Sequence, residues 1–88
     1  MKVKIDTSFE RDVKKIKDIL ILKKLGNLIT SCINAGQLQD INNCKKLNGF
    51  KNYYRIRLND YRIGLRVENE ELIFERILHR KEIYRFFP

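Results

Sequence analysis

The sequence is poor in the residues that build metal centres and disulfides. It has two cysteines and one histidine, and Cys32 and Cys44 form no Cys-x-x-Cys pair and stand far from His79. A zinc site needs more ligands than these, and a disulfide has no place in a reducing cytosol. We therefore expect no metal ion and no disulfide, and we interpret Cys32 as a small core residue.

Long apolar runs are missing as well. No stretch approaches the roughly 20 apolar residues that a bilayer-spanning helix needs. The first residues, Met-Lys-Val-Lys-Ile-Asp, lack the apolar segment of a secretory signal. Internal repeats, linkers and low-complexity segments are also absent. We expect a single domain over residues 1–88, located in the cytoplasm and without a membrane partner.

Acidic residues are fewer than basic residues. The 88 residues include 19 Lys and Arg against 11 Asp and Glu, which gives a formal net charge of +8. In a domain of this size, that charge must occupy much of the surface. It favours a polyanion as substrate or partner, which could be nucleic acid, an acidic protein or an anionic membrane.

The first half of the chain has the patterns of one strand and two helices. Residues 2–6 alternate charged and apolar side chains, as a short strand does. Thr7 and Glu10 have the spacing of a capping box at a helix start. A second helix is predicted to begin at the N-cap Asp18 and to stop at Gly36, with a broad apolar stripe over residues 19–33.

The second half has the period of strands. Residues 37–52 are polar and are interpreted as a connector. Strands are predicted over residues 53–58, 61–67 and 72–78, and Asn59-Asp60 forms a tight turn between the first two. The third strand has apolar residues on both parities, which predicts a central position in the sheet. A short helical turn or irregular tail covers residues 80–86. The fold class is α+β, in the order β-α-α-β-β-β, with a helical hairpin packed on a small antiparallel sheet.

The predicted strand hairpin gathers arginines on one face. Arg55 and Arg57 alternate with apolar residues on the first strand, and Arg62 and Arg66 do so on the second. Like charges side by side repel, but a bound phosphate would offset that repulsion and suits the guanidinium fork. Tyr53 on the same face could stack on an unpaired base. The alternative interpretation, a solvated basic face that serves only solubility, is equally compatible with the sequence.

Proton transfer requires a different residue type. An arginine does not release its proton in a protein, so the arginines, Arg80 included, can only hold phosphate and stabilise charge. General acid–base work would fall to His79, Tyr84 or a lysine, and His79 has the best-matched intrinsic pKa. A lone histidine is more often structural. The carboxylates form no catalytic set, and no phosphate-binding glycine loop is present.

Several of these segments together resemble a known family. They are Leu-Asn-Gly-Phe from Leu47, Tyr-Tyr-Arg-Ile-Arg-Leu from Tyr53, Asp-Tyr-Arg-Ile-Gly from Asp60, and Ile-Leu-His-Arg-Lys-Glu-Ile-Tyr-Arg from Ile77. They resemble RelE-type toxins of the RelE/ParE superfamily, and the preceding strand and helices match that family in order and length. The resemblance implies a RelE-like fold and the toxin of a type II toxin–antitoxin system.

The resemblance also implies an activity. RelE-type toxins cut messenger RNA in the ribosomal A site without metal or cofactor, through attack by the RNA's own 2′-hydroxyl, and an antitoxin silences them. By family position, Arg55, Arg57 and Arg62 match the basic residues of the hairpin. His79 or Arg80, together with Tyr84, match the C-terminal catalytic group. Better-known members carry lysines at the positions of Arg55 and Arg57, and the Arg80–Tyr84 spacing is shorter here than in some relatives.

Other functions remain open from the sequence. ParE-like members of the superfamily inhibit DNA gyrase without nuclease activity. A non-catalytic nucleic-acid-binding module and an inactive toxin that still binds its antitoxin are further alternatives. Lys51 and Lys81 would contact RNA or serve only as solubilising charge. The apolar stripe over residues 19–33 would receive an antitoxin helix or fill the core.

Overall fold

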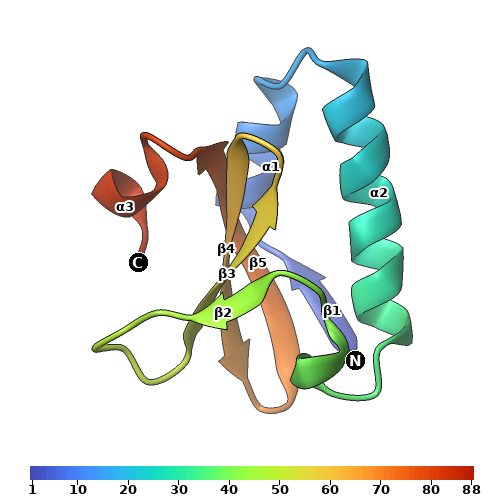
Figure 1. Ribbon diagram of the computed structural model, residues 1–88, viewed down its shortest axis with the longest axis vertical. Helices are drawn as coiled ribbons and strands as arrows, with labels where there is room; N and C mark the ends of the chain where they lie inside the picture. Colours follow the sequence, from blue (N-terminus) through green and yellow to red (C-terminus); the bar gives the residue numbers. More distant parts are fainter.

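A five-stranded sheet in the order β1-β5-β4-β3-β2 forms the centre of the protein (Figure 1). The computed structural model describes all 88 residues, Met1–Pro88. The strands are β1 (Lys2–Ile5), β2 (Cys44–Lys46), β3 (Tyr53–Leu58), β4 (Tyr61–Glu68) and β5 (Glu71–His79). β1 runs parallel to β5 and the other pairs are antiparallel. The α+β class and the helices-first order are therefore confirmed.

Helices lie on both sides of this sheet. The helices are α1 (Thr7–Lys14), α2 (Ile19–Asn34), a short 3-10 turn η1 (Leu38–Asp40) and the C-terminal α3 (Ile83–Phe86). Figure 1 shows α2 on one side of the strands and α3 on the other. None of the helices is long and apolar enough to cross a membrane.

One of the two predicted helix starts is confirmed. The Asp18 side chain caps α2 by accepting hydrogen bonds from the backbone N–H groups of Leu20 (3.0 Å) and Ile21 (3.4 Å). The capping box at Thr7 and Glu10 is wrong, because Asp6 is the N-cap residue of α1 and Thr7 already lies inside the helix. α2 ends at Asn34 with Ala35 as its extended C-cap residue, and Gly36 follows without a positive φ.

The main core lies between the helical hairpin and one sheet face. Phe9 of α1 meets Phe74 of β5 edge to face, with ring centroids 5.4 Å apart. Cys32 is fully buried in this core, as predicted. The sheet contributes a row of buried side chains from its three longest strands: Ile56, Leu58, Ile63, Leu65, Leu72, Phe74 and Ile77. Burial of these apolar side chains holds the helices against this face of the sheet.

A β-bulge explains why β5 has apolar residues on both parities. β5 lies inside the sheet between β1 and β4, as predicted. Gly64 pairs with Arg76 while the next residue, Leu65, pairs with Phe74, so Glu75 is an extra residue on β5. The extra residue reverses the alternation. Phe74 and Ile77 therefore both face the main core.

The connector predicted for residues 37–52 is wrong in part. It contains η1 and the edge strand β2, which pairs with β3 from Cys44↔Ile56 to Lys46↔Tyr54. A strand of three residues is too short to show a period of two, so the pattern gave no signal for it.

The second sheet face carries the predicted arginines, but they do not occupy all of it. The C-terminal tail packs on it, with Ile83 fully buried and Phe87 only 3% exposed. The Phe87 ring lies directly over Gly64, where an added Cβ would meet it at 2.6 Å. The tail therefore covers the middle of this face and leaves the end near the β3–β4 turn uncovered.

Candidate nucleic-acid interface

The strand register places the basic side chains in rows on the second sheet face. Arg57 pairs with Arg62, as the turn at Asn59-Asp60 predicts, and Arg55 pairs with Gly64. Directly opposed residues point to the same side of a sheet. The side chains of Arg55, Arg57 and Arg62 therefore lie together on the face that carries α3.

Arg62 is the centre of this group. One of its guanidinium nitrogens donates hydrogen bonds to the backbone carbonyls of Asn59 and Tyr61, each at 2.8 Å, so the turn holds the side chain in place. Partial burial lowers the pKa of Arg62, and the nearby cations Arg57, Arg55 and Arg80 lower it further, while Tyr84 acts in the opposite direction. These five side chains are therefore electrostatic neighbours, and a bound anion would relieve the repulsion among the four cations.

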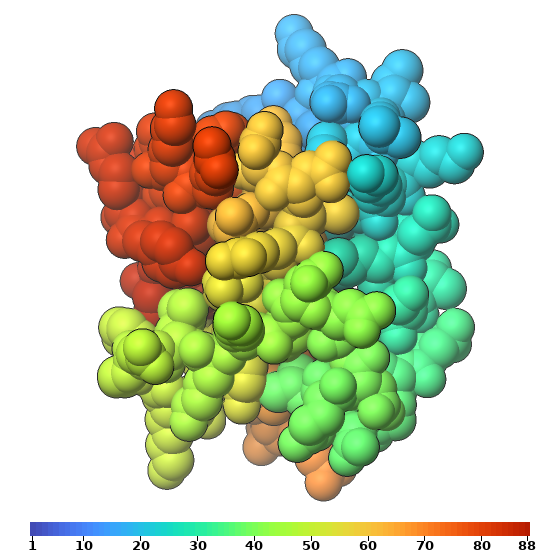
Figure 2. All heavy atoms as spheres, viewed as in Figure 1, coloured from blue at the N-terminus to red at the C-terminus, as the bar shows by residue number.

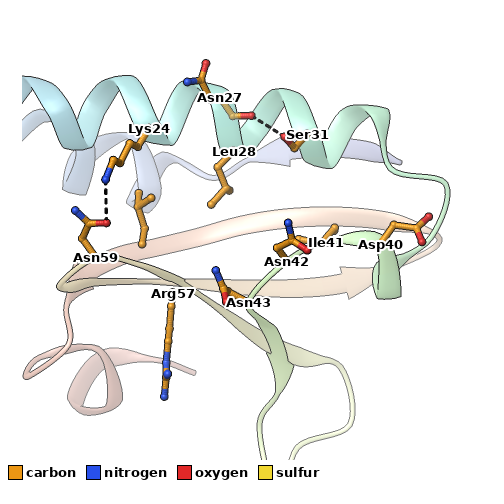
Figure 3. A pocket seen from close by; sticks show the side chains of 11 residues that line it. Lys24, Asn27, Leu28, Ser31, Asp40, Ile41, Asn42, Asn43, Arg57 and Asn59 are labelled. Atoms are coloured by element: carbon orange, nitrogen blue, oxygen red, sulfur yellow. Dashed lines mark hydrogen bonds between the residues drawn. The ribbon is translucent and has the colours of Figure 1, made fainter.

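Arg57 is exposed and free of ion pairs. A hollow of about 680 Å³ lies between α2 and the β3–β4 hairpin, and Figure 3 shows the side chains that line it. The Arg57 side chain points away from α2 in this view, toward the side of the sheet that carries α3. Its charge is thus directed at the uncovered end of the second face.

Arg80 and Tyr84 reach the same region from the C-terminal segment. The Arg80 backbone N–H donates to the Asp60 carbonyl at 2.7 Å, which ties this segment to the β3–β4 turn. The Arg80 guanidinium lies 4.0 Å from the Asp60 carboxylate, and both side chains are mostly exposed. Tyr84 projects from α3 with 58% of its surface exposed. The structure therefore brings Arg80 and Tyr84 to the arginines.

His79 lies on the other side of the sheet. It pairs with Tyr61, a residue of the core face, and the two rings meet at a centroid distance of 6.1 Å. Its Nδ1 accepts a hydrogen bond from the backbone N–H of Lys81 at 3.2 Å. The bulge at Glu75 is the cause, because without the extra residue His79 would point to the arginine face. No pattern in the sequence marks that bulge.

Arg66 is separated from the other arginines by its partners. Its guanidinium donates to Glu75 at 2.6 Å and also pairs with Glu68. The hydrogen bond to Glu75 raises the pKa of Arg66. Acidic side chains therefore neutralise the basic face at this end, because the bulge turns Glu75 of β5 toward Arg66.

The other residues predicted to contact RNA do not form one cluster. The Tyr53 ring is half-buried between Phe50 (5.9 Å) and Phe87 (5.5 Å), both met edge to face, so it also serves the packing of the tail. Lys51 and Lys81 are exposed and make no ion pair. Sequence reasoning missed Lys45 of β2, which pairs with Arg55 and shares its face.

The potential metal ligands and the cysteines form no second site. No three His, Cys, Asp or Glu side chains lie in an arrangement that could hold a metal ion. Cys32 and Cys44 are both free thiols, and burial raises the pKa of Cys32 to about 11. Neither cysteine lies in the arginine cluster.

Known proteins share this architecture and, in part, this sequence. The family model described as the ParE toxin of type II toxin–antitoxin systems (parDE) matches residues 3–84. Toxin RelE3 of Methanocaldococcus jannaschii is 43% identical over 89 residues, which cover all of both chains.

Solved structures of other proteins share this fold. The RelB–RelE antitoxin–toxin complex from Methanococcus jannaschii has a chain that is 39% identical to this one, with a TM-score of 0.82 and coverage of 97% of this chain and 99% of that chain. The RelBE2 toxin–antitoxin complex from Mycobacterium tuberculosis shares the fold at 22% identity and a TM-score of 0.70, over 90% and 96% of the two chains. This chain therefore belongs to the RelE/ParE superfamily, whose members are the toxins of type II toxin–antitoxin systems.

Proposed function

We propose that this toxin is a metal-independent endoribonuclease, an mRNA interferase that cuts translated messenger RNA at the ribosome in the cytoplasm and uses no cofactor. The observation that carries the proposal is the cluster around Arg62. Four arginines and one tyrosine converge there, and the one carboxylate beside them is the exposed Asp60, 4.0 Å from Arg80. Such a cluster fits a phosphodiester whose charge increases during the reaction.

The chemical step needs only the RNA and these side chains. The 2′-oxygen of the RNA attacks the adjacent phosphorus and the bond from phosphorus to the 5′-oxygen breaks. The products are a 2′,3′-cyclic phosphate and a 5′-hydroxyl. Arg55, Arg57 and Arg62 would bind the phosphate and stabilise the added negative charge of the transition state, and Arg80 would approach from the tail.

The proton must reach the leaving 5′-oxygen from another group. Tyr84 stands beside Arg62, and its phenol is a hydrogen-bond donor that can supply a proton. The proton lost by the 2′-hydroxyl passes to solvent, because the site is open. His79 would take part only through an RNA strand that curls around the end of β5, so we favour Tyr84 as the general acid.

Induction of variants in a bacterial host, with the 5′ ends of messages mapped by primer extension, tests this proposal. We expect in-frame cuts with the wild type and with Lys17→Ala, an exposed lysine in the α1–α2 loop. Arg62→Ala should lower the cleavage rate roughly 100- to 1,000-fold, and Tyr84→Phe roughly 100-fold or more. His79→Ala should retain most of the activity if it folds.

Each other outcome selects a different function. Growth arrest with intact messages would identify a ParE-like inhibitor of DNA gyrase. If the protein is soluble but causes neither growth arrest nor cuts, it is a non-catalytic nucleic-acid-binding module or an inactive toxin. Loss of cutting in His79→Ala alone would return the proton transfer to His79.

We also propose a cognate antitoxin as the partner. The relatives from Methanococcus jannaschii and Mycobacterium tuberculosis were each solved as complexes with an antitoxin. On this chain an apolar hollow of about 430 Å³ opens between β1, α1 and α2, and its lining includes Ile5, Val13 and Ile29. Its lining also includes one acid, Glu10, and one base, Lys14, and Ile5 is 38% exposed. The apolar side of an amphipathic antitoxin helix fits this surface.

Co-expression with the proposed cognate antitoxin tests this surface. Ile5→Glu should weaken antitoxin protection at least tenfold while the toxin still cuts messages. Ile19→Glu is the matched control, since Ile19 is 81% exposed and lies outside the hollow. Equal protection of both variants would move the antitoxin to another face, such as the sheet.

A further inference from the structure

A second groove begins at the arginine cluster and runs away from it. It has a volume of about 630 Å³ and lies between β2, the loop that follows it and the C-terminal tail. Arg55 and Tyr84 form one end of its lining. In Figure 2 the C-terminal tail, in red, meets the yellow-green loop segment at this place. The volume is within the roughly 300–1,000 Å³ of ordinary ligand pockets.

The charged side chains that line this groove are all basic, namely Lys45, Lys46 and Arg55. Lys45 is the register partner of Arg55, so it adds one more cation to the row on the second face. Lys45 and Arg55 make no ion pair, and no Asp or Glu side chain lines the groove. Three other hollows each contain an acid, namely Asp40, Glu10 or Glu70. An anionic ligand is thus favoured in this groove.

An aromatic ring completes the lining. Phe50 is 47% exposed although phenylalanine is usually buried. Its aromatic neighbour Tyr53 meets it edge to face at an interplanar angle of 90°, so this pair leaves at least one face of Phe50 free of Tyr53. A basic groove with an open aromatic ring is the arrangement that holds single-stranded nucleic acid, because phosphates pair with cations and bases stack on rings.

We infer that this groove binds the nucleotide next to the cleaved phosphate, with Lys45 on the flanking phosphate and Phe50 stacked on the base. The inference rests on the proposed RNA cleavage at the Arg62 cluster. The continuity of the groove with Arg55 and Tyr84 favours RNA over an acidic protein segment, because one strand can cross both sites. Stacking on phenylalanine accepts any base, so this subsite supplies affinity without sequence preference.

Kinetics on ribosomes programmed with a defined message test the inference, with purified wild type, Lys45→Ala, Phe50→Ala and Lys17→Ala. Phe50→Ala should raise KM roughly 5- to 100-fold with little change in kcat. Lys45→Ala should raise KM and reduce the slope of log(kcat/KM) against log salt by about 0.7, the value for one phosphate contact on a single strand. Lys17→Ala should match the wild type in both. Phe50→Tyr keeps the aromatic ring and Lys45→Arg keeps the positive charge, so the KM of each should stay close to the wild-type value.

The outcomes separate this inference from the proposed function. A wild type that cuts no message overturns both. A wild type that cuts, with Lys45→Ala and Phe50→Ala indistinguishable from Lys17→Ala, overturns the subsite alone. Normal KM in these variants combined with weakened antitoxin binding would assign the groove to the antitoxin. Failure of Phe50→Tyr to restore KM would show that Phe50 acts through packing against Tyr53.

Discussion

Gly64 determines how the C-terminal tail sits on the sheet. The Phe87 ring lies over the missing side chain, and a Cβ at position 64 would approach three ring carbons at 2.6–2.7 Å. Gly64→Ala must therefore displace the ring. We expect a loss of about 1–3 kcal/mol in the free energy of unfolding, measured by urea denaturation. The cleavage rate should fall roughly 100-fold, because Tyr84 shifts with the tail.

Gly26→Ala provides the matched control. Nothing lies within 4 Å of a Cβ at this position of α2, and alanine favours a helix by up to about 1 kcal/mol over glycine. This variant should be at least as stable as the wild type and equally active. If Gly64→Ala matched it in stability and rate, Phe87 would not be the anchor of the tail.

The thiol of Cys32 makes the stability of the fold sensitive to alkaline pH. Burial, followed by the neighbouring Cys44, raises its pKa from 9.0 to about 11. The protonated thiol is thus favoured in the folded state, so this contribution is complete below pH 9 and is lost as pH rises toward 11. Two pKa units correspond to about 2–3 kcal/mol. In urea denaturation between pH 8 and 11, the wild type should lose stability more steeply than Cys32→Ala, and parallel curves would contradict this.

Single residues also show which parts of the site the sequence could predict. The Arg57–Arg62 pair followed from counting residues around the Asn59-Asp60 turn, because strand register is local. The side of the sheet that His79 faces depends instead on one extra residue, Glu75, four positions earlier. No composition or period marks that bulge, since it results from how β5 pairs with β4. The same bulge delivers Glu75 to Arg66.

At the scale of elements, α1 closes an open strand edge. β1 pairs with β5 only as far as Phe74, so the backbone of residues 75–79 has no strand on that side. α1 takes its place: the Ser8 hydroxyl donates to the Glu75 carbonyl at 2.6 Å, and the buried Asp12 carboxylate accepts from the Ile77 N–H at 3.0 Å. Asp12 also binds the Arg76 guanidinium at 2.7 Å. Side chains of α1 thus replace a missing strand.

Asp12→Ala should therefore be costly. It leaves the Ile77 N–H without an acceptor and Arg76 without its partner, which predicts a loss of about 3 kcal/mol in the free energy of unfolding. Asp12→Asn keeps a carbonyl acceptor for Ile77 and should lose less. Hydrogen exchange of the Ile77 amide distinguishes the causes, because it should accelerate in Asp12→Ala and remain slow in Asp12→Asn. Equal exchange in both would mean that the ion pair alone matters.

The elements differ in how well the sequence predicts them. α2 and the strands β3, β4 and β5 are long enough for their periods to show, and each was predicted within a few residues. The failures are short: β2 has three residues, and α1 starts one residue after Asp6, whose side chain makes no capping bond. Such elements depend on neighbours that pair with them, and those neighbours are distant in the sequence.

At the scale of the whole molecule, the net charge of +8 is unevenly compensated. Arg66 and Arg76 pair with acids, whereas Arg57 and Arg55 make no ion pair on the same sheet face. Formal charge therefore overstates the number of cations that a polyanion meets. On the second sheet face, the unpaired Arg55 and Arg57 lie on β3 and the unpaired Lys45 on β2, which is where both proposed RNA contacts lie.

Arg57→Ala and Arg66→Ala remove the same formal charge and should differ in RNA binding. Binding to a single-stranded RNA with 2′-O-methyl sugars, which cannot be cleaved by 2′-hydroxyl attack, can be followed by fluorescence anisotropy from low to high salt. Arg57→Ala should reduce the slope of log K against log salt by about 0.7, the release of one phosphate contact. Arg66→Ala should leave that slope unchanged, because Glu68 and Glu75 already neutralise its guanidinium. Equal slopes in the two variants would mean that RNA displaces these carboxylates and that the basic face extends along the whole of β4.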